Sequence, residues 1–271
     1  MKESRLARAI SRSLSPSAKR WIQRWCWPMM PGWPDEGRRI VQGPHLQSLL
    51  ARAAAEAGGF RHVFNAGSGE CGFSPLLFGL PKVESVIESD FGFCTLKPVR
   101  THAMQVFFGS SLVSVPLRDN SVELVLCTEV LEHIHEDGQA LDELARVTAP
   151  CGWLLITVPT PPAPPDAAHV REGYRPAELE SMLAERGFEL IETRFCMHFF
   201  FRFVLAHWWQ LPWCPRGLIR ALSGLDRVIR IGPPMDLLML ARMRSSKAAP
   251  ARSQPGADGA SYGSGKREEV A

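Results

Sequence analysis

The sequence predicts an α/β fold in which a doubly wound, mostly parallel β-sheet carries helices on both faces. Two observations support this prediction. Short apolar runs alternate with amphipathic stretches through most of the chain, which is the pattern of consecutive βαβ units. The 271 residues are also 45% hydrophobic, which is enough for one sizeable buried core. We therefore expect one α/β domain with appendages.

The predicted elements follow one another along the chain. A first helix is expected at 45–57, where leucines recur at helical spacing and two glycines follow. The later apolar runs are short and bounded by turn residues, as strands are. Strands are expected at 61–66, 85–88, 122–127, 153–158, 188–195 and 237–243, and further helices at 129–134, 140–147 and 176–186.

Composition divides the chain into three zones. Residues 1–45 form a basic leader rich in tryptophan, and residues 1–40 hold nine lysines and arginines against three acids. Residues 46–245 form the folded domain, with an aromatic insertion at 199–235. Residues 246–271 consist mainly of serine, glycine, alanine and charged residues, so we expect a disordered tail there.

Cysteine usage and charge narrow the class of protein. The seven cysteines are scattered without a Cys-x-x-Cys pair, which argues against a disulfide framework and a structural zinc site. A reducing, cytoplasmic location is the natural expectation. No stretch reaches the roughly 18 uninterrupted apolar residues of a membrane span. The formal net charge of +3 is too small to indicate a nucleic-acid partner, and we expect none.

A glycine-rich segment is the first indication of a ligand site. A predicted strand runs into Gly67-x-Gly69-x-x-Gly72, and glycine lets the backbone approach a ligand closely. The same spacing fits the dinucleotide fingerprint, so the loop alone does not exclude a nicotinamide cofactor. A tight turn without any ligand is the alternative interpretation of these residues.

An acidic residue at the end of the next strand would hold the ribose hydroxyls of a nucleotide ligand. Glu88 and Asp90 are the two candidates. We favour Asp90, because Val86 and Ile87 precede it as core residues and the apolar Phe91 follows it. Glu88 stays open as the alternative, because the spacing rule is loose by a few residues.

Two later segments are more specific. Val115–Ile134 contains Pro-x-x-Asp-Asn-Ser followed by Glu-Val-Leu-Glu-His, and Glu143–Pro159 contains a Pro-x-Gly turn and an apolar strand. With the glycine loop and the acidic strand end, in this order, they resemble the class I S-adenosylmethionine-dependent methyltransferases of the quinone-biosynthesis and small-molecule type. The resemblance covers about residues 60–195. It implies a Rossmann-like fold with a seven-stranded sheet, and S-adenosylmethionine as the cofactor.

The resemblance also implies a role for each position that matches the family's cofactor site. The implied cofactor residues are Asn65, Gly67, Ser68 and Gly69 at the amino-acid moiety, Asp90 and Phe91 at the ribose and adenine, Ser111 and Leu112 at the adenine edge, and Thr128 and Glu129 near the methionine end.

Three positions depart from the family's pattern. The family usually has Asp at the position of Asn65, Gly at that of Cys71, and Asp at the adenine-edge position held here by Ser110 or Ser111. Asn65 lacks the charge that attracts the α-ammonium of the cofactor, and serine accepts a hydrogen bond more weakly than a carboxylate does. These changes lower the expected affinity and leave open a domain that binds the cofactor weakly.

His133 is the candidate catalytic base, since an O- or N-acceptor must lose a proton. We expect Glu129, Glu132 and His133 to share one face of a helix. A supporting role for His133 at the sheet rim is an equal alternative. In some quinone-ring methyltransferases a similar Glu-x-x-Glu-His set binds a divalent ion, but we expect no metal here. His169 and Tyr174 are further acceptor-site candidates, with loop anchoring as their simpler role.

The expected function is methyl transfer from S-adenosylmethionine to a small-molecule acceptor, which can be apolar or lipid-linked. A catalytically weak or inactive cofactor-binding module is the main alternative. A nicotinamide-dependent oxidoreductase is supported only by the glycine spacing, and a nucleic-acid methyltransferase would need an Asn/Asp-Pro-Pro-Tyr/Phe tetrapeptide after the fourth strand. The tryptophans and arginines of the leader and the insertion favour a small satellite core, an apolar acceptor pocket or peripheral membrane contact.

Overall fold

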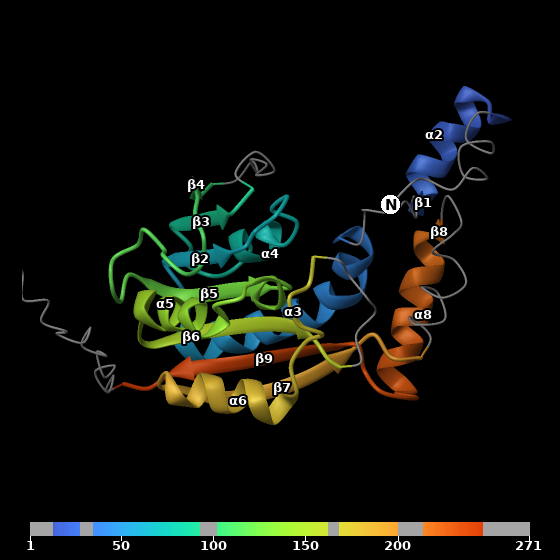
Figure 1. Cartoon of the computed structure of the whole chain (residues 1–271). Helices are drawn as coiled ribbons and strands as arrows, with labels where there is room; N and C mark the ends of the chain where they lie inside the picture. Colours follow the sequence, from blue (N-terminus) through green and yellow to red (C-terminus); the bar gives the residue numbers. More distant parts are fainter. Residues whose placement is uncertain (1–12, 28–34, 93–101, 162–167, 200–213, 246–271) are drawn as a thin grey trace, which may run out of the picture.

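A computed structural model describes residues 13–27, 35–92, 102–161, 168–199 and 214–245. Most of these residues build one seven-stranded sheet with helices packed against it (Figure 1). From one edge to the other, the strands are β4 (Met104–Gly109), β3 (Ser85–Asp90), β2 (His62–Ala66), β5 (Val122–Thr128), β6 (Thr148–Pro159), β9 (Asp236–Met243) and β7 (Phe188–Cys196).

The strand order explains where a ligand can bind. β9 runs antiparallel to its neighbours β6 and β7, and all the other neighbouring strands are parallel. The chain builds β3 and β4 on one side of β2 and then β5 and β6 on the other side. Such a reversal opens a crevice at the carboxyl ends of the strands, where ligands of open α/β sheets bind. The doubly wound, seven-stranded, mostly parallel sheet expected from the sequence is confirmed.

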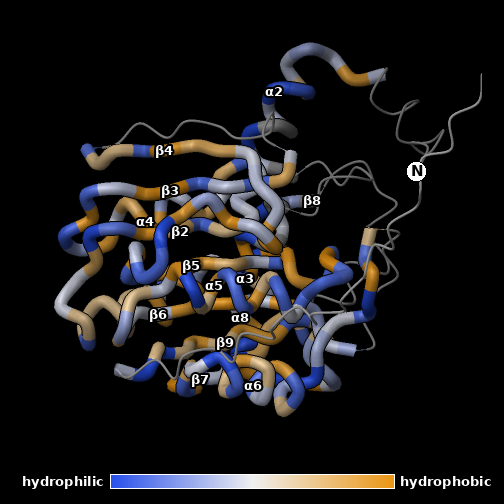
Figure 2. Tube along the Cα trace, turned by 60° about the vertical axis from the view of Figure 1, so that its left-hand side comes forward, coloured by the Kyte–Doolittle hydropathy of each residue, from blue (hydrophilic) through white to orange (hydrophobic). Residues whose placement is uncertain are grey.

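Alternate residues of the central strands face opposite sides of the sheet and build two cores. Val63 and Leu124 belong to the first core, whereas Phe64 and Val125 belong to the second. Because both faces are covered, the central strands are almost continuously apolar. Figure 2 shows β5 and β9 mostly in orange, the colour of hydrophobic residues. The covering helices are α3 (Asp35–Ala57), α4 (Ser74–Phe78) and α8 (Arg216–Val228) on the first face, and α5 (Asp137–Val147) and α6 (Pro176–Glu185) on the second.

A second, two-stranded sheet connects the leader to a distant part of the chain. β1 (Cys26–Trp27) pairs antiparallel with β8 (Cys214–Pro215), and helix α2 (Pro16–Trp25) precedes β1. Figure 1 shows these elements, together with α8, beside the large sheet rather than within it. Among the described helices, none combines the length and apolarity needed to cross a membrane.

The predicted zone boundaries need one revision. The boundary expected after residue 45 falls inside α3, where Gln42 is already fully buried. The folded body therefore begins at Asp35. Of the expected insertion at 199–235, residues 200–213 lie outside the described residues, and the same holds for the expected tail at 246–271.

Two secondary-structure predictions were wrong. Strand β4 was not expected, because it forms an edge of the sheet where Met104 and Val106 are exposed and no buried apolar run marks it. The helix expected at 129–134 is a single 3₁₀ turn, η2 (Leu131–His133). Glu129 precedes it with a φ of +54°, which is outside the helical region.

Candidate active site

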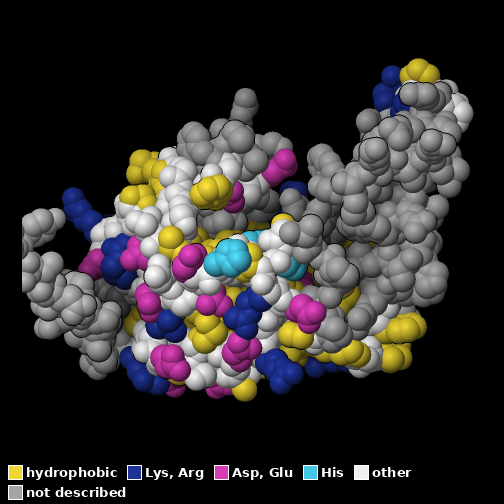
Figure 3. All heavy atoms as spheres, viewed as in Figure 1, with side chains coloured by type: hydrophobic (Ala, Val, Ile, Leu, Met, Phe, Trp, Pro, Cys, Tyr) yellow, Lys and Arg dark blue, Asp and Glu magenta, His cyan; other side chains and the backbone are white. Residues whose placement is uncertain are grey.

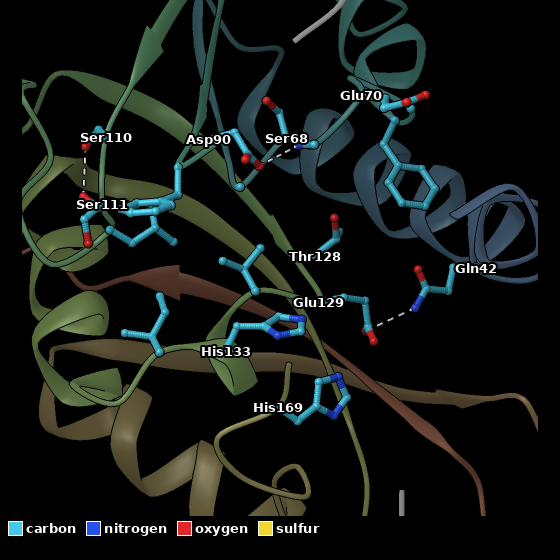
Figure 4. A pocket seen from close by; sticks show the side chains of 18 of the residues that line it. Gln42, Ser68, Glu70, Asp90, Ser110, Ser111, Thr128, Glu129, His133 and His169 are labelled. Atoms are coloured by element: carbon cyan, nitrogen blue, oxygen red, sulfur yellow. Dashed lines mark hydrogen bonds between the residues drawn. The ribbon is translucent and has the colours of Figure 1, made fainter. Parts of the chain in front are cut away.

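A cavity of about 770 Å³ opens where β2, β3 and β5 end at the carboxyl edge of the sheet. This volume lies within the range of typical small-molecule sites, roughly 300–1,000 Å³. The residues that line it come from the first half of α3 and from the segments that follow β2, β3, β4, β5 and β6 (Figure 4). The cavity therefore lies at the position that the strand order predicts for a ligand site.

The glycine loop forms one wall and is fastened to the next strand. The backbone N–H groups of Gly67 and Ser68 both donate to the Ser89 carbonyl, at N–O distances of 2.8 and 2.9 Å. Gly67 has a φ of +70°, and a Cβ there would lie 2.2 Å from a side-chain methyl of Val130. Gly69 also has a positive φ, but a Cβ there would meet nothing within 4 Å. Gly67 is therefore required by packing as well as by backbone conformation.

Asp90 faces the cavity at the end of β3. Its two carboxylate oxygens accept hydrogen bonds from the backbone N–H groups of Gly69 (2.9 Å) and Gly92 (2.8 Å). Each oxygen keeps a second lone pair, so the carboxylate can also accept from hydroxyls of a ligand. Asp90 thus fixes the glycine loop and remains an acceptor at the cavity wall (Figure 4).

Glu88 occupies a different place from Asp90. Its side chain is fully buried and does not line the cavity. The amides of Asn65 and Gln105 donate to its two carboxylate oxygens, at 2.7 and 3.1 Å. The structure therefore favours Asp90 over Glu88 as the acidic residue of the cavity, and it places Asn65 against Glu88 rather than at the cavity wall.

Beside Asp90, an aromatic ring and two serines form the edge of the cavity. Phe91 is 88% exposed, which leaves one ring face free for stacking. The hydroxyl of Ser110 lies 2.8 Å from the Ser111 carbonyl oxygen and 3.0 Å from that of Ser114, so its proton is directed into its own loop. Ser111 and Leu112 also line the cavity. Of the two serines, Ser111 is the better placed to contact a ligand.

The opposite end of the cavity contains a network of buried polar side chains. The Glu129 Oε1 atom accepts from the Thr157 hydroxyl (2.8 Å) and from the Gln42 amide (3.2 Å). The same Gln42 nitrogen donates to Asp236 at 2.8 Å, and Asp236 is 4% exposed. Two carboxylates therefore meet here, and one of them, Glu129, lines the cavity. This end of the cavity suits a positively charged group.

Gln42 was missed in the sequence analysis. It lies on α3, in a segment assigned to the leader, and it lines the cavity together with Arg39. A signal was present, because Gln42 precedes Leu46 and Leu49 at helical spacing and is the one polar residue on that apolar face.

His133 and His169 form the third side of the cavity. The His133 ring donates from Nδ1 to the Ala168 carbonyl at 2.9 Å, which leaves Nε2 of the neutral ring with a lone pair. The His169 ring lies edge-on to it, with 4.7 Å between ring centroids. Figure 4 shows the His133 ring beside Glu129 and the His169 ring below them.

Glu132 lies next to His133 but is fully buried, and it does not line the cavity. Its Oε1 atom lies 3.8 Å from His133 Nε2. Because Glu129 lies outside any helix, the prediction that Glu129, Glu132 and His133 share one helix face was wrong. Ligand atoms of Glu132, His133 and His169 nevertheless lie within 4.8 Å of one another, and this two-histidine, one-carboxylate set resembles zinc sites in its chemistry.

Tyr174, the other acceptor-site candidate, is an anchor of its loop. Its side chain is fully buried, and its hydroxyl donates to Asp137 at 2.9 Å. Burial, followed by the contact with Asp137, raises the pKa of Tyr174 well above its usual range. Since it does not line the cavity, it is not placed to contact an acceptor.

Comparison with known proteins adds an independent observation. Residues 64–156, which span the strands from β2 into β6, match the family described as a methyltransferase domain. The chain is also 31% identical over 177 residues to a Mycolicibacterium smegmatis protein described as an S-adenosylmethionine-dependent methyltransferase. Residues 64–156 therefore form a domain of this methyltransferase family. The aligned region covers 62% of this chain and 66% of that relative.

Other relatives of this methyltransferase agree. A Mycobacterium tuberculosis protein with the same description is 29% identical over 150 residues, 52% of each chain. The chain thus spans about half to two thirds of the length of these curated relatives. Solved structures of methyltransferases from Archaeoglobus fulgidus and Mesorhizobium loti share its fold, with TM-scores of 0.53 and 0.50 at 16% identity. They cover 78% and 74% of this chain, and the matches extend over 99% and 97% of those chains.

The family implies S-adenosylmethionine as the cofactor, and the residues of this cavity fit that molecule. A carboxylate acceptor and an exposed ring at one end suit a ribose and an adenine, and the acidic end suits a sulfonium and an ammonium. Of the cofactor residues predicted from the resemblance, all except Asn65 line the cavity, namely Gly67, Ser68, Gly69, Asp90, Phe91, Ser111, Leu112, Thr128 and Glu129.

The departure of this methyltransferase at Cys71 has a conformational side. Cys71 has a φ of +59°, a region that glycine enters freely and that other residues rarely adopt. The glycine usual in the family relieves this strain. In this chain the Cys71 side chain is 3% exposed, so the loop keeps its shape with a buried thiol in place of a glycine.

Proposed function

We propose that this chain transfers a methyl group from S-adenosylmethionine to a small-molecule acceptor, apolar or lipid-linked, whose reacting atom carries a proton. One observation supports this most directly: Asp90 and His133, whose Nδ1 is hydrogen-bonded to the Ala168 carbonyl, line the same cavity. The first suits the nucleoside part of the cofactor and the second suits the removal of a proton. A cavity with only the first feature would indicate a binding module.

In the proposed complex, Asp90 accepts from the ribose hydroxyls, and Phe91 and Ser111 contact the adenine. Glu129 provides the negative charge near the methionine end, and Gln42 and Thr157 hold its carboxylate in place. Its position is therefore set before a ligand arrives, and such preorganisation is what a methyl transfer chiefly needs from a protein. When bound, S-adenosylmethionine supplies a methyl group already activated on a sulfonium.

His133 provides the base in this proposal. Its Nδ1 proton is directed to the Ala168 carbonyl, so Nε2 is the atom that accepts a proton from an acceptor hydroxyl or amine. The imidazolium formed in this way would have the buried Glu132 carboxylate 3.8 Å away. General-base catalysis of this kind typically contributes about 10²–10⁴ in rate.

Two observations support an acceptor with an apolar part. The cavity wall includes the side chains of Val130, Ile134 and Phe73. The described surface near the start of β9 also carries exposed apolar side chains, which are treated below. The names of the relatives specify the methyl donor and no acceptor.

Calorimetry and a transfer assay test the proposal together. The protein is titrated with S-adenosylmethionine, with its demethylated product and with nicotinamide dinucleotides. We expect binding of the first two only. The protein is then incubated with methyl-labelled cofactor and a panel of phenols, quinols and amines. At least one acceptor should become labelled, and the label should be recovered in an apolar phase. Tight dinucleotide binding without a signal for S-adenosylmethionine would contradict the proposal.

A further inference from the structure

We infer that the C-terminal end of α8 and the loop after it form a docking surface for an anionic lipid bilayer. The inference goes beyond methyl transfer, because it concerns where the protein works rather than which reaction it performs. It rests on exposed apolar side chains, on the arginines among them, and on their position at the sheet edge that holds the cavity.

The apolar part of this surface is formed by four residues, Phe199, Val228, Ile229 and Ile231, which we call the α8 patch. Val228 is 82% exposed, and the other three are between 42% and 50% exposed. The Phe199 backbone N–H donates to the Ile231 carbonyl at 3.1 Å, so the two ends of the patch lie side by side. Figure 3 shows apolar side chains gathered at the lower end of α8. Apolar side chains gathered in this way mark interaction sites more often than scattered ones do.

The exposed charges of the segment that carries the α8 patch are positive. Segment 214–235 contains four arginines and a single acid, Asp226, which is 3% exposed. Arg220, Arg227 and Arg230 are exposed on α8 and just after it. The opposite side of the helix packs inward through Ile219 and Ser223. A helix with one packed face and an outer surface of apolar and cationic residues is typical of proteins that lie on anionic membranes.

The lowered pKa of a buried histidine indicates a positive electrostatic potential next to the α8 patch. His45, on α3, lines a small cavity together with Arg227 and Arg230. Burial, followed by the charges of Arg227, Arg194 and Arg230, lowers the pKa of His45 to about 4. The arginines therefore act together on this region, and an anionic surface is the complementary partner.

The position of the patch relates it to the active site. Asp236, at the start of β9, pairs with Pro159 and Cys196, which end β6 and β7. The loop that carries Ile231 leads directly into this strand, so the α8 patch lies towards the same carboxyl edge of the sheet as the cavity. A chain docked through the patch would present this edge to the bilayer.

Vesicle co-sedimentation tests the inference on the full chain. We use vesicles of phosphatidylcholine alone and of phosphatidylcholine mixed with phosphatidylglycerol, and we compare the wild type with the double variant Val228→Asp/Ile231→Asp. The matched control is Met104→Asp, which introduces a charge at a side chain that is 63% exposed on β4, at the opposite edge of the sheet. Calorimetry with S-adenosylmethionine on each protein shows that the fold is intact.

We expect the wild type and Met104→Asp to sediment with the anionic vesicles and to stay in solution with the neutral ones. The double variant should lose at least fivefold in bound fraction, and added salt should weaken binding, because exposed charges are screened. Equal sedimentation of the double variant, or none of the wild type, would overturn the inference. So would a dimer in sedimentation velocity that only the double variant abolishes, since the patch would then join two copies of the chain. None of these outcomes depends on whether the proposed transfer occurs.

Discussion

Asn65 and Glu88 face each other across β2 and β3, and the Asn65 amide donates to the Glu88 carboxylate with 2.7 Å between Nδ2 and Oε2. Both side chains are buried, at 2% and 0% exposure. The family usually has an aspartate at position 65, and in this chain an aspartate would place a second carboxylate against Glu88. Asn65 therefore complements a buried acid of the chain itself, which gives its departure from the family a structural reason.

Replacing Asn65 by aspartate should destabilise the fold, and more so as pH rises. Two buried carboxylates in contact cannot both ionise easily, so the pKa of one of them rises in the folded state above its unfolded value of about 4. Stability is then kept below the unfolded pKa and lost as pH increases through the raised pKa. We expect Asn65→Asp to lower the free energy of unfolding by at least about 2 kcal/mol at neutral pH, with a smaller loss at pH 5. Urea unfolding at the two pH values measures this.

A double variant provides the control for that experiment. Asn65→Asp combined with Glu88→Gln exchanges donor and acceptor, because the new amide can donate to the new carboxylate and still accept from Gln105. Stability should return to within about 1 kcal/mol of the wild type. If the double variant is no more stable than Asn65→Asp alone, the contact between residues 65 and 88 is not what limits the single variant.

Loss of Asp90 should weaken cofactor binding, whereas loss of Glu88 should destabilise the fold. Asp90→Ala removes a carboxylate from the cavity wall, so S-adenosylmethionine affinity should fall by about 10- to 100-fold, which corresponds to about 1.5–3 kcal/mol. Glu88→Ala removes a buried acceptor, so it should lower the unfolding temperature while the folded protein keeps its affinity within about threefold. Calorimetry and thermal unfolding on both variants separate the two effects. A larger loss of affinity from Glu88→Ala would mean that Glu88 is the ribose ligand.

Gly67→Ala should be far more damaging than Gly69→Ala. A methyl group on residue 67 would overlap the Val130 side chain, whereas one on residue 69 meets no protein atom. We expect Gly67→Ala to cost about 2–3 kcal/mol of stability, from overpacking and a strained φ together. Adding Val130→Ala should recover part of this loss by removing the overlapping atoms. No recovery in thermal unfolding would show that backbone strain alone explains the defect.

Loss of His133 should slow turnover without weakening cofactor binding. His133→Ala removes the proposed base, so kcat should fall by about 10²-fold or more, while S-adenosylmethionine affinity stays within about twofold. Dialysis of the wild type against a chelator should leave turnover unchanged, because the proposed transfer uses no metal. A loss that one divalent ion restores would instead assign Glu132, His133 and His169 to a metal site.

Deletion of residues 1–34 should leave cofactor binding nearly intact. It removes α2 and β1 but spares α3, which contributes Arg39 and Gln42 to the cavity. We expect S-adenosylmethionine affinity within about threefold of the full chain, together with lower solubility, because β8 loses its paired strand. A folded truncated protein that cannot bind the cofactor would show that the leader is part of the cofactor site.

The sequence predicted the fold well because buried strands such as Val122–Thr128 are marked by runs of apolar residues. The same physics explains what was missed, since an edge strand such as β4 can be exposed and shows no such run. The loops that contact the cofactor were predicted because their glycines and acidic residues follow one another at a characteristic spacing within a short stretch of sequence. Gln42 and the Asn65–Glu88 contact depend on elements far apart in the chain, and no local pattern encodes such contacts. Glu129, whose positive φ is incompatible with the expected helix, likewise donates its backbone N–H to the carbonyl of the distant Thr157.

The position of β9 in the sheet has a consequence for folding of the chain during its synthesis. β9 is the last strand in chain order, yet it lies between β6 and β7 and is the only sheet neighbour of β7 among the described strands. While a ribosome synthesises residues 160–235, the apolar β6 therefore has an open edge and β7 has no strand to pair with. Unpaired apolar edges are sites of aggregation, and slowly completed sheets prolong that exposure. The edges of β6 and β7 therefore stay open to aggregation until residue 243 has emerged.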